Sequence, residues 1–156
     1  MRLPYTSATP SFKTAEESQI LDRTAGTMIA IRTKNSLPPD VREMTFCRAA
    51  ALTGAWYEWD IHSPIGLEAG IGDDVMKLLK EGKSLGEGPG SLDKRQRAVV
   101  EYTDAMTLSG KVPKAVFEAV RAHFNEKEMV ELTASIAGFN TVSRFVVALD
   151  VGEKNV

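Results

Sequence analysis

The stretch 42–71, REMTFCRAAALTGAWYEWDIHSPIGLEAGI, decides the expected fold, because two helical patterns in it meet at one break. Pro38-Pro39-Asp40 opens the first helix just upstream, since proline is tolerated in a first helical turn. One face of that helix is apolar, with Met44, Cys47, Ala50 and Ala51. Thr53-Gly54 marks a break or a close backbone approach. The second helix is predicted from about residue 55 to residue 68, before Gly70.

The rest of the chain continues the helical pattern on both sides of this stretch. Thr14 and Glu17 fit a capping box for an earlier helix that ends near Asn35. Further helices are predicted over about 72–79, 91–109, 112–124 and 125–149, with the segment LGEGPG at 85–90 as a loop. Neither alternating strands nor internal repeats are visible. The fold class is therefore all-α, a single-domain bundle of about six helices over 14–150, with an extended arm at 1–13 and a tail at 151–156.

Composition excludes several classes of protein. The chain has 156 residues, 43% hydrophobic and 26% charged, with a formal net charge of -2. That balance favours neither nucleic acid nor an anionic membrane as a partner. With neither a signal-like N-terminus nor an apolar run of about 18 residues, the sequence indicates a soluble cytoplasmic protein. Its single cysteine, Cys47, cannot form an internal disulfide or cycle with a second thiol.

The segment WYEWDIH, residues 56–62, carries the first candidate for chemistry. Glu58 and His62 are four residues apart, so on a helix they share one face. A carboxylate beside an imidazole fixes the ring tautomer and raises its basicity, as proton transfer requires. The tryptophans could wall a dry pocket that shifts the pKa of an acid. An ordinary surface pair between Glu58 and His62, with core tryptophans, is the alternative from spacing alone.

Other residues have a functional and a structural interpretation. Glu43 shares an apolar stripe with Cys47, so its acid needs a partner such as Arg42 or Arg48. Cys47 itself fits a small buried hydrophobe. Asn140 on the last helix is either a pocket residue or an interhelical hydrogen bonder.

The chain has few side chains that could bind a transition metal. His62 and His123 are the only imidazoles, and His123 fits a helix end, so we expect no metal site.

Residues Leu37 to Leu149 resemble the carboxymuconolactone decarboxylase family of the alkylhydroperoxidase D-like superfamily. The resemblance rests on Arg42-Glu43, an apolar helix, Tyr57-Glu58-Trp59-Asp60-Ile61-His62 and Ala69-Gly70-Ile71, and on the closing helix VELTASIAGFNTVSRFVVAL with its Asn140. It implies the same all-α fold and a homo-oligomer, a trimer or a hexamer.

The peroxidatic members of that superfamily carry a Cys-x-x-Cys pair ahead of the histidine. Aligned on His62, those two positions are Ala55 and Glu58, and the upstream relay glutamate is Glu43. The resemblance is therefore to a member that keeps the proton relay and lacks the thiols. This argues against a thiol peroxidase, which needs a thiolate and a resolving partner.

The resemblance implies a cofactor-independent decarboxylase acting on a small carboxylated lactone or anhydride. His62 is then the proton donor, with Glu58 and Glu43 as relay. Tyr57 and Trp59 shape the pocket, with Asn140 as a further contact, and Arg48 pairs with the substrate carboxylate unless it is a plain helix-surface arginine. Two alternatives remain: an isomerase or cyclase of a secondary-metabolite pathway using the same relay, and a non-catalytic oligomeric binding protein.

Overall fold

The computed structural model describes residues 26–81 and 92–153, and within these ranges it is helical with no strand, which confirms the all-α class. The helical segments are residues 26–33, α2 (Pro39–Thr53), α3 (Trp56–Glu68), α4 (Asp73–Glu81), α5 (Lys94–Leu108), α6 (Lys114–Arg121), α7 (Glu126–Leu149) and the short 3₁₀ turn η1 (Val151–Glu153). The predicted arm at 1–13, the Thr14–Glu17 capping box and the loop at 85–90 lie outside the described residues.

Side chains and special backbone positions define the helix ends. Asn125 and Glu128 form a reciprocal capping box at the start of α7, where the sequence predicted the last helix to begin. Asp93 and Gln96 form the same box at the start of α5. Gly54 ends α2 in the left-handed conformation, with φ of 72°, and the Ala55 N–H bonds the Ala50 carbonyl at 2.9 Å. Glycine adopts this conformation without strain, so the chain turns directly into α3.

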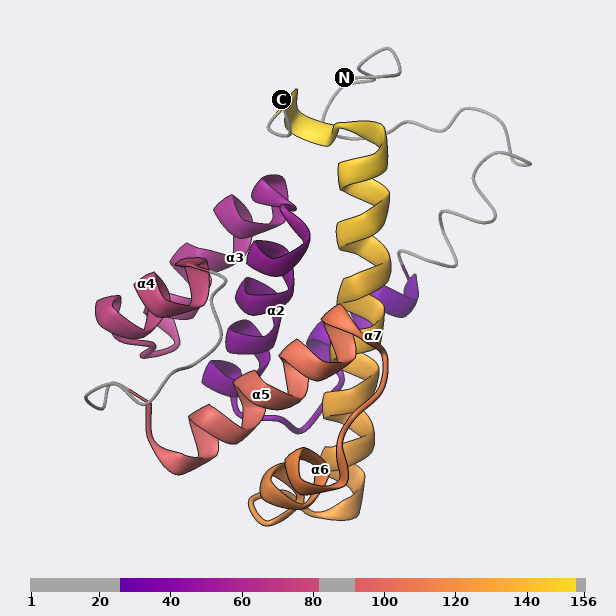
Figure 1. Cartoon of the computed structure of the whole chain (residues 1–156). Coiled ribbons are helices and arrows are strands. Elements are labelled where there is room, and N and C mark those ends of the chain that lie inside the picture. Colours follow the sequence, from indigo (N-terminus) through magenta and orange to yellow (C-terminus); the bar gives the residue numbers. More distant parts are fainter. Residues whose placement is uncertain (1–25, 82–91, 154–156) are drawn as a thin grey trace.

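Helix α2 is the centre of the fold. It packs against α3, α4, α5 and α7, and α5 crosses between α2 and α6 (Figure 1). Because neighbours surround α2, its charged Glu43 and Arg48 are fully buried together with Met44 and Phe46. Buried charges have to be paired, so the position of α2 dictates two buried ion pairs.

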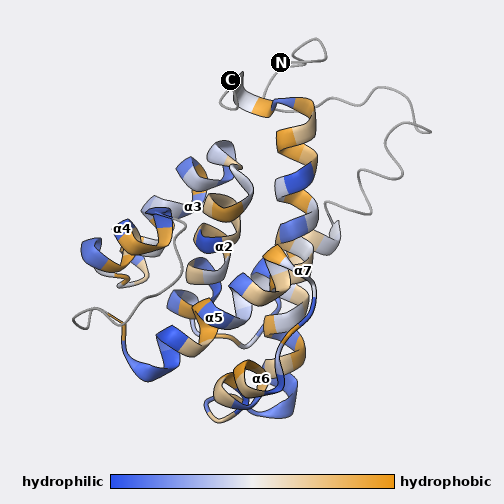
Figure 2. Cartoon of the chain, viewed as in Figure 1, coloured by the Kyte–Doolittle hydropathy of each residue, from blue (hydrophilic) through white to orange (hydrophobic). Residues whose placement is uncertain are grey.

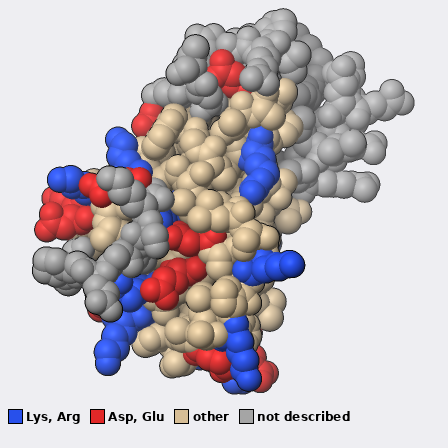
Figure 3. All heavy atoms as spheres, viewed as in Figure 1, with Lys and Arg blue, Asp and Glu red and all other residues tan. Residues whose placement is uncertain are grey.

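Helix α7 combines a core face with an exposed apolar face. Leu132 and Ile136 are fully buried, whereas Val130 and Phe145 are 69% and 48% exposed. Hydrophobic residues recur along its C-terminal half (Figure 2), and few charged side chains cover its upper part in the face shown in Figure 3. By length and composition alone α7 could cross a membrane. In this fold it packs against α2 and α5.

Candidate functional site

The turn at Gly54 brings Glu43 and His62 together. Glu43 lies eleven residues before Gly54 and His62 eight residues after it, so a hairpin of two helices places them at similar heights. Oε2 of Glu43 lies 2.7 Å from Nδ1 of His62, and both side chains are buried. One turn after His62, Gly66 packs closely beneath Met76, because a Cβ on Gly66 would lie 2.9 Å from Cε of Met76.

Two stacked phenyl rings hold the imidazole. Phe46 of α2 and Phe139 of α7 stack with their centroids 4.4 Å apart. The His62 ring stands edge-on to both, at 5.0 Å from each centroid. Edge-to-face contacts of this kind stabilise one ring orientation. His62 is therefore fixed by packing as well as by its hydrogen bond.

Glu43 is held ionised despite its burial. Burial alone would raise the pKa of Glu43, but the hydrogen bond and charge of His62 and the charge of Arg42 outweigh it and lower that pKa. Nε of Arg42 donates to Oε1 of Glu43 at 3.1 Å. An ionised carboxylate only accepts hydrogen bonds, so Nδ1 of His62 carries a proton. In the neutral ring, Nε2 is then the basic nitrogen.

Glu58 flanks the other side of the same ring. Its Oε2 lies 3.7 Å from Nε2 of His62, one helical turn apart on α3. Burial raises the pKa of Glu58, and the charges of His62 and Arg32 offset this only in part. Glu43 and Glu58 thus have pKa values shifted in opposite directions, and such pairs typically divide acid and base roles.

A small pocket of about 180 Å³ opens beside this array. It is lined by Glu58, His62 and Arg32 together with apolar side chains from three segments, namely Met28, Ile29, Ile31, Phe46, Phe139 and Val142. The stretch 26–33 passes behind α7 (Figure 1). Gly138 of α7 allows this approach, since a Cβ there would lie 2.7 Å from Cδ1 of Ile31 and 3.0 Å from Cε of Met28.

The structure brings the three residues predicted to be catalytic into one array, but it places the predicted aromatic pocket residues elsewhere. Trp59 is only 6% exposed, packs edge-on against Trp56 and carries Nζ of Lys80 at 5.6 Å from its ring. Tyr57 covers the C-terminal turn, where a Cβ on Gly152 would lie 2.6 Å from Cδ2 of Tyr57. Both rings belong to faces of α3 turned away from the pocket.

Arg48 also departs from the sequence-based expectation. It is not a surface arginine, because it is fully buried, and its guanidinium is already engaged. Nε and Nη2 bond the two carboxylate oxygens of Asp104 at 2.6 and 2.7 Å, and Nη1 donates to the Leu79 carbonyl at 3.2 Å. Such a two-pronged buried pair ties α2 to α5 and α4 and does not face the pocket of His62.

Asn140 makes interhelical hydrogen bonds, which was the structural alternative to a place in the pocket. Its amide donates to Oγ1 of Thr107 at 2.9 Å and to the Ile136 carbonyl at 3.0 Å, and its oxygen accepts from Arg144. It joins α7 to α5 and is not part of the pocket lining. These bonds satisfy the polar group on an otherwise apolar helix face.

The sequence-based reasoning missed Arg32, Phe46 and Phe139 as site residues. Arg32 lies one helical turn after Met28, on the predicted helix that ends near Asn35, so the two share a face of that helix. This spacing is the local signal that could have pointed to Arg32. Phe46 and Phe139 were recognisable only as apolar residues, since nothing local indicates which ring they contact.

The single cysteine lies next to the array but is inert in character. Cys47 is fully buried, as expected, and burial together with the charge of Glu43 raises the pKa of its thiol to about 12. Nucleophilic cysteines are thiolates at neutral pH and are accessible. Cys47 has neither property.

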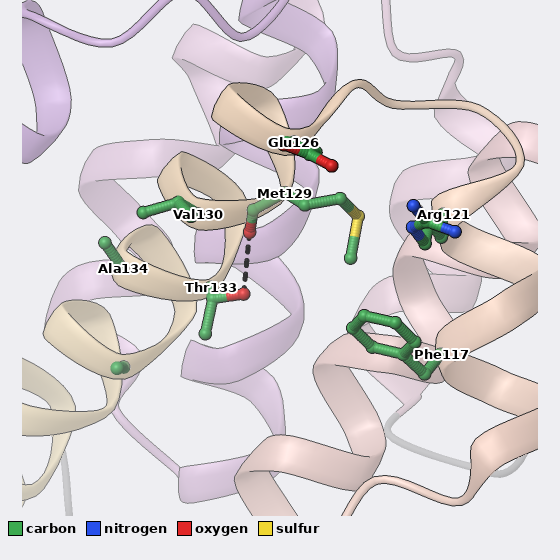
Figure 4. A pocket seen from close by; sticks show the side chains of 8 residues that line it. Phe117, Arg121, Glu126, Met129, Val130, Thr133 and Ala134 are labelled. Atoms are coloured by element: carbon green, nitrogen blue, oxygen red, sulfur yellow. Dashed lines mark hydrogen bonds between the residues drawn. The ribbon is translucent and has the colours of Figure 1, made fainter.

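A larger groove of about 510 Å³ lies between α6 and α7 (Figure 4). Phe117, Met129 and Val130 line it, with Arg121 and Glu126 at its edge. Its lining includes no histidine, in contrast to the pocket of His62. Within the described ranges, no three His, Cys, Asp or Glu side chains are placed to hold a metal ion.

Comparisons with known proteins support the fold. No family model matches the sequence, and no curated protein matches it significantly. A solved protein of unknown function from Agrobacterium tumefaciens, proposed to be an antioxidant defence protein AhpD, superposes with a TM-score of 0.75 at 22% identity, over 96% of this chain and 95% of that one. An uncharacterised peroxidase-related protein from Silicibacter sp. TM1040 gives 0.70 at 18% identity, over 86% and 72%. These likenesses confirm the expected alkylhydroperoxidase D-like fold.

Proposed function

We propose that the chain is a cofactor-independent proton-transfer enzyme that decarboxylates a small lactone or anhydride. The observation that carries the proposal is His62, held between an ionised Glu43 and a Glu58 of raised pKa at the wall of a small pocket. This arrangement supplies a base, an acid and a largely apolar cavity, the parts that acid–base chemistry on carbon requires.

The reaction proceeds by loss of CO2 and protonation of carbon. The bond between the carboxylate and the substrate carbon breaks, and its electron pair passes into the conjugated carbonyl as an enolate. The protonated ring of His62, stabilised by Glu43, delivers the Nε2 proton to that carbon. Glu58 then returns a proton from solvent to Nε2. The apolar side chains beside His62 favour the first step, because leaving water strips a carboxylate of its hydration.

The dimensions of the pocket favour a small substrate. Pockets for drug-sized ligands typically span about 300–1,000 Å³, whereas this one measures about 180 Å³. The same relay serves an isomerase or a cyclase equally well, because both begin or end with proton transfer at carbon. Decarboxylation and these alternatives differ in whether mass is lost.

The direct test is mass spectrometry of a panel of small carboxylated lactones and anhydrides incubated with the protein in D2O. We expect loss of CO2 with one deuterium gained. His62→Gln should reduce the rate by about 10²–10⁴-fold, the usual contribution of general acid–base catalysis. Gln retains a donor for Glu43, so folding is preserved and is checked by circular dichroism. His123→Gln is the matched control, since His123 is exposed after α6.

Each outcome separates the candidates. Deuterium incorporation without loss of CO2 would assign an isomerase or cyclase. Unchanged turnover in His62→Gln would refute the proposed role of this array. Binding of panel members without any turnover would favour the non-catalytic binding protein.

A thiol peroxidase is the competing function, because one structural neighbour is described as peroxidase-related. The chain has one cysteine, and both its burial and its raised pKa oppose a peroxidatic role. Peroxide consumption that disappears in Cys47→Ala would favour the peroxidase instead.

We also propose that the protein forms a homo-oligomer, a trimer or a hexamer, through the outer face of α7. Val130 and Phe145 expose apolar surface on that helix, and Phe117 borders the adjoining groove. Large exposed apolar side chains on one helix are typical of an interface between subunits. Analytical ultracentrifugation of the parent and of Val130→Asp tests it: a monomeric parent would refute the interface.

A further inference from the structure

Arg32 is the one guanidinium in the lining of the His62 pocket. Its side chain is exposed, whereas His62 and Glu58 are 4% and 7% exposed. The positive charge therefore lies at the mouth of the pocket and the proton-transfer groups lie deeper. Arg48, the arginine expected to bind substrate, is committed to Asp104.

The stretch that carries Arg32 is seated against α7. Gly138 leaves room for the ends of Met28 and Ile31, which anchor residues 26–33 beside Phe139 and Val142. Arg32 follows Ile31 directly and lies one turn after Met28, so the same packing that seats those two side chains sets its position. Arg32 is thus presented to the pocket by a packed helix.

We propose that Arg32 determines specificity by pairing with an anionic group, a carboxylate, at the mouth of the pocket while the reacting carbon lies against His62. The inference deepens the proposed function, because it assigns a substrate-selecting residue to the same site. A guanidinium offers a planar fork of donors that matches a carboxylate. The apolar lining accepts the body of the substrate.

Two features of the site support this placement. Glu58 also lines the pocket, and its raised pKa makes the neutral acid accessible beside a bound anion. The charge of Arg32 partly offsets that shift, as expected of a cation near the Glu58 carboxyl. An anion at the mouth would then meet a cation and an acid able to donate a hydrogen bond.

The test measures binding without turnover, with sodium benzoate as the probe and benzamide as its uncharged counterpart. Calorimetry gives affinity, and the imidazole resonances of His62 report occupancy of this pocket. We expect Arg32→Gln to weaken benzoate by about tenfold or more and to leave benzamide nearly unchanged. Arg32→Lys should retain part of the affinity. Arg121→Gln, the same change at the groove between α6 and α7, should have no effect.

The proposal is overturned if benzoate does not bind the parent, if Arg32→Gln binds it as tightly, or if benzamide loses affinity to the same extent. These outcomes are distinct from failure of the proposed function. A protein that binds benzoate through Arg32 but decarboxylates nothing refutes only the reaction. A decarboxylase whose KM is unchanged in Arg32→Gln refutes only the role of Arg32.

Discussion

Glu43 on α2 accepts a hydrogen bond from His62 on α3, with 2.7 Å between Oε2 and Nδ1, although nineteen residues separate them. This bond fixes the ring tautomer and orientation and stabilises the protonated ring, as carboxylate–imidazole pairs do in many enzymes. In the proposed mechanism Glu43 is therefore a positioning residue, and His62 is the group that meets the substrate.

Replacing Glu43 with Gln tests that division of roles. The amide keeps the shape but lacks the charge that stabilises the protonated imidazole, so we expect turnover to fall by about 10²-fold. The resonance of the Nδ1 proton of His62, followed by NMR, should move as well, because its hydrogen bond is no longer made to a charged acceptor. A purely structural role would leave turnover unchanged in a variant that folds normally. Arg42→Gln, which changes the other partner of Glu43, should have a smaller effect on turnover.

The stability of the protein should depend on Glu43 in an acid-sensitive way. The pKa of Glu43 is lowered in the folded protein from its ordinary value of 4.5, so folding is favoured while the carboxylate is ionised. That stabilisation is present above about pH 4.5 and is lost as the pH falls through the folded pKa. Urea unfolding from pH 7 downward should show Glu43→Gln less stable than the parent at neutral pH, with the gap closing in acid. A constant gap would contradict the linkage.

The contribution of Glu58 to stability should depend on pH in the opposite direction. Burial raises its pKa above 4.5, so the folded state holds a proton that the unfolded chain releases. Stability then falls as the pH rises through the interval between the two pKa values. Glu58→Gln removes this cost, so we expect the variant to be more stable than the parent at pH 7 and similar to it well below pH 4.5. The same variant should lose activity, which separates a functional acid from a structural one.

The thiol of Cys47 should be unreactive in the folded protein. It is fully buried and its pKa is raised to about 12. Labelling by a disulfide reagent should therefore be slow at neutral pH and become rapid in denaturing urea. Cys47→Ala should keep the activity of the parent and lose about 1 kcal/mol of stability, a typical cost for a small core change. Rapid labelling of the native protein would show an accessible thiolate.

Breaking the buried pair of Arg48 and Asp104 should destabilise the fold. Removing one partner of a buried ion pair leaves an uncompensated charge and costs about 3–5 kcal/mol. We expect the loss of stability in Asp104→Asn to lie near the lower end of this range, because the Asp104 side chain is 18% exposed and water can partly solvate the group that remains. Arg48→Met with Asp104→Leu should recover much of the loss. Urea titration measures the stability of the single and the double variant. If Arg48 instead bound the substrate directly, these changes would leave stability unchanged and raise KM.

The sequence by itself predicted the helices, with ends within a few residues of those observed, because the signals at helix ends are local. Gly54, Asn125 and Glu128 act on the backbone within a few residues of themselves, so their effect does not depend on the rest of the fold. Helical spacing also placed Glu58 beside His62. The resemblance supplied Glu43 as the third member of the array, and the structure places all three together.

Only the tertiary structure decided what surrounds that array. Arg32, Phe46 and Phe139 come from three helical segments, and their meeting depends on how each helix is rotated and packed. The same cause removed Arg48 and Trp59 from the expected pocket. Helical periodicity states which residues share a face of one helix, but the partner of that face is chosen by packing among all the helices at once. The pairing of Glu58 with His62 was therefore readable in the sequence, and the pocket beside it was not.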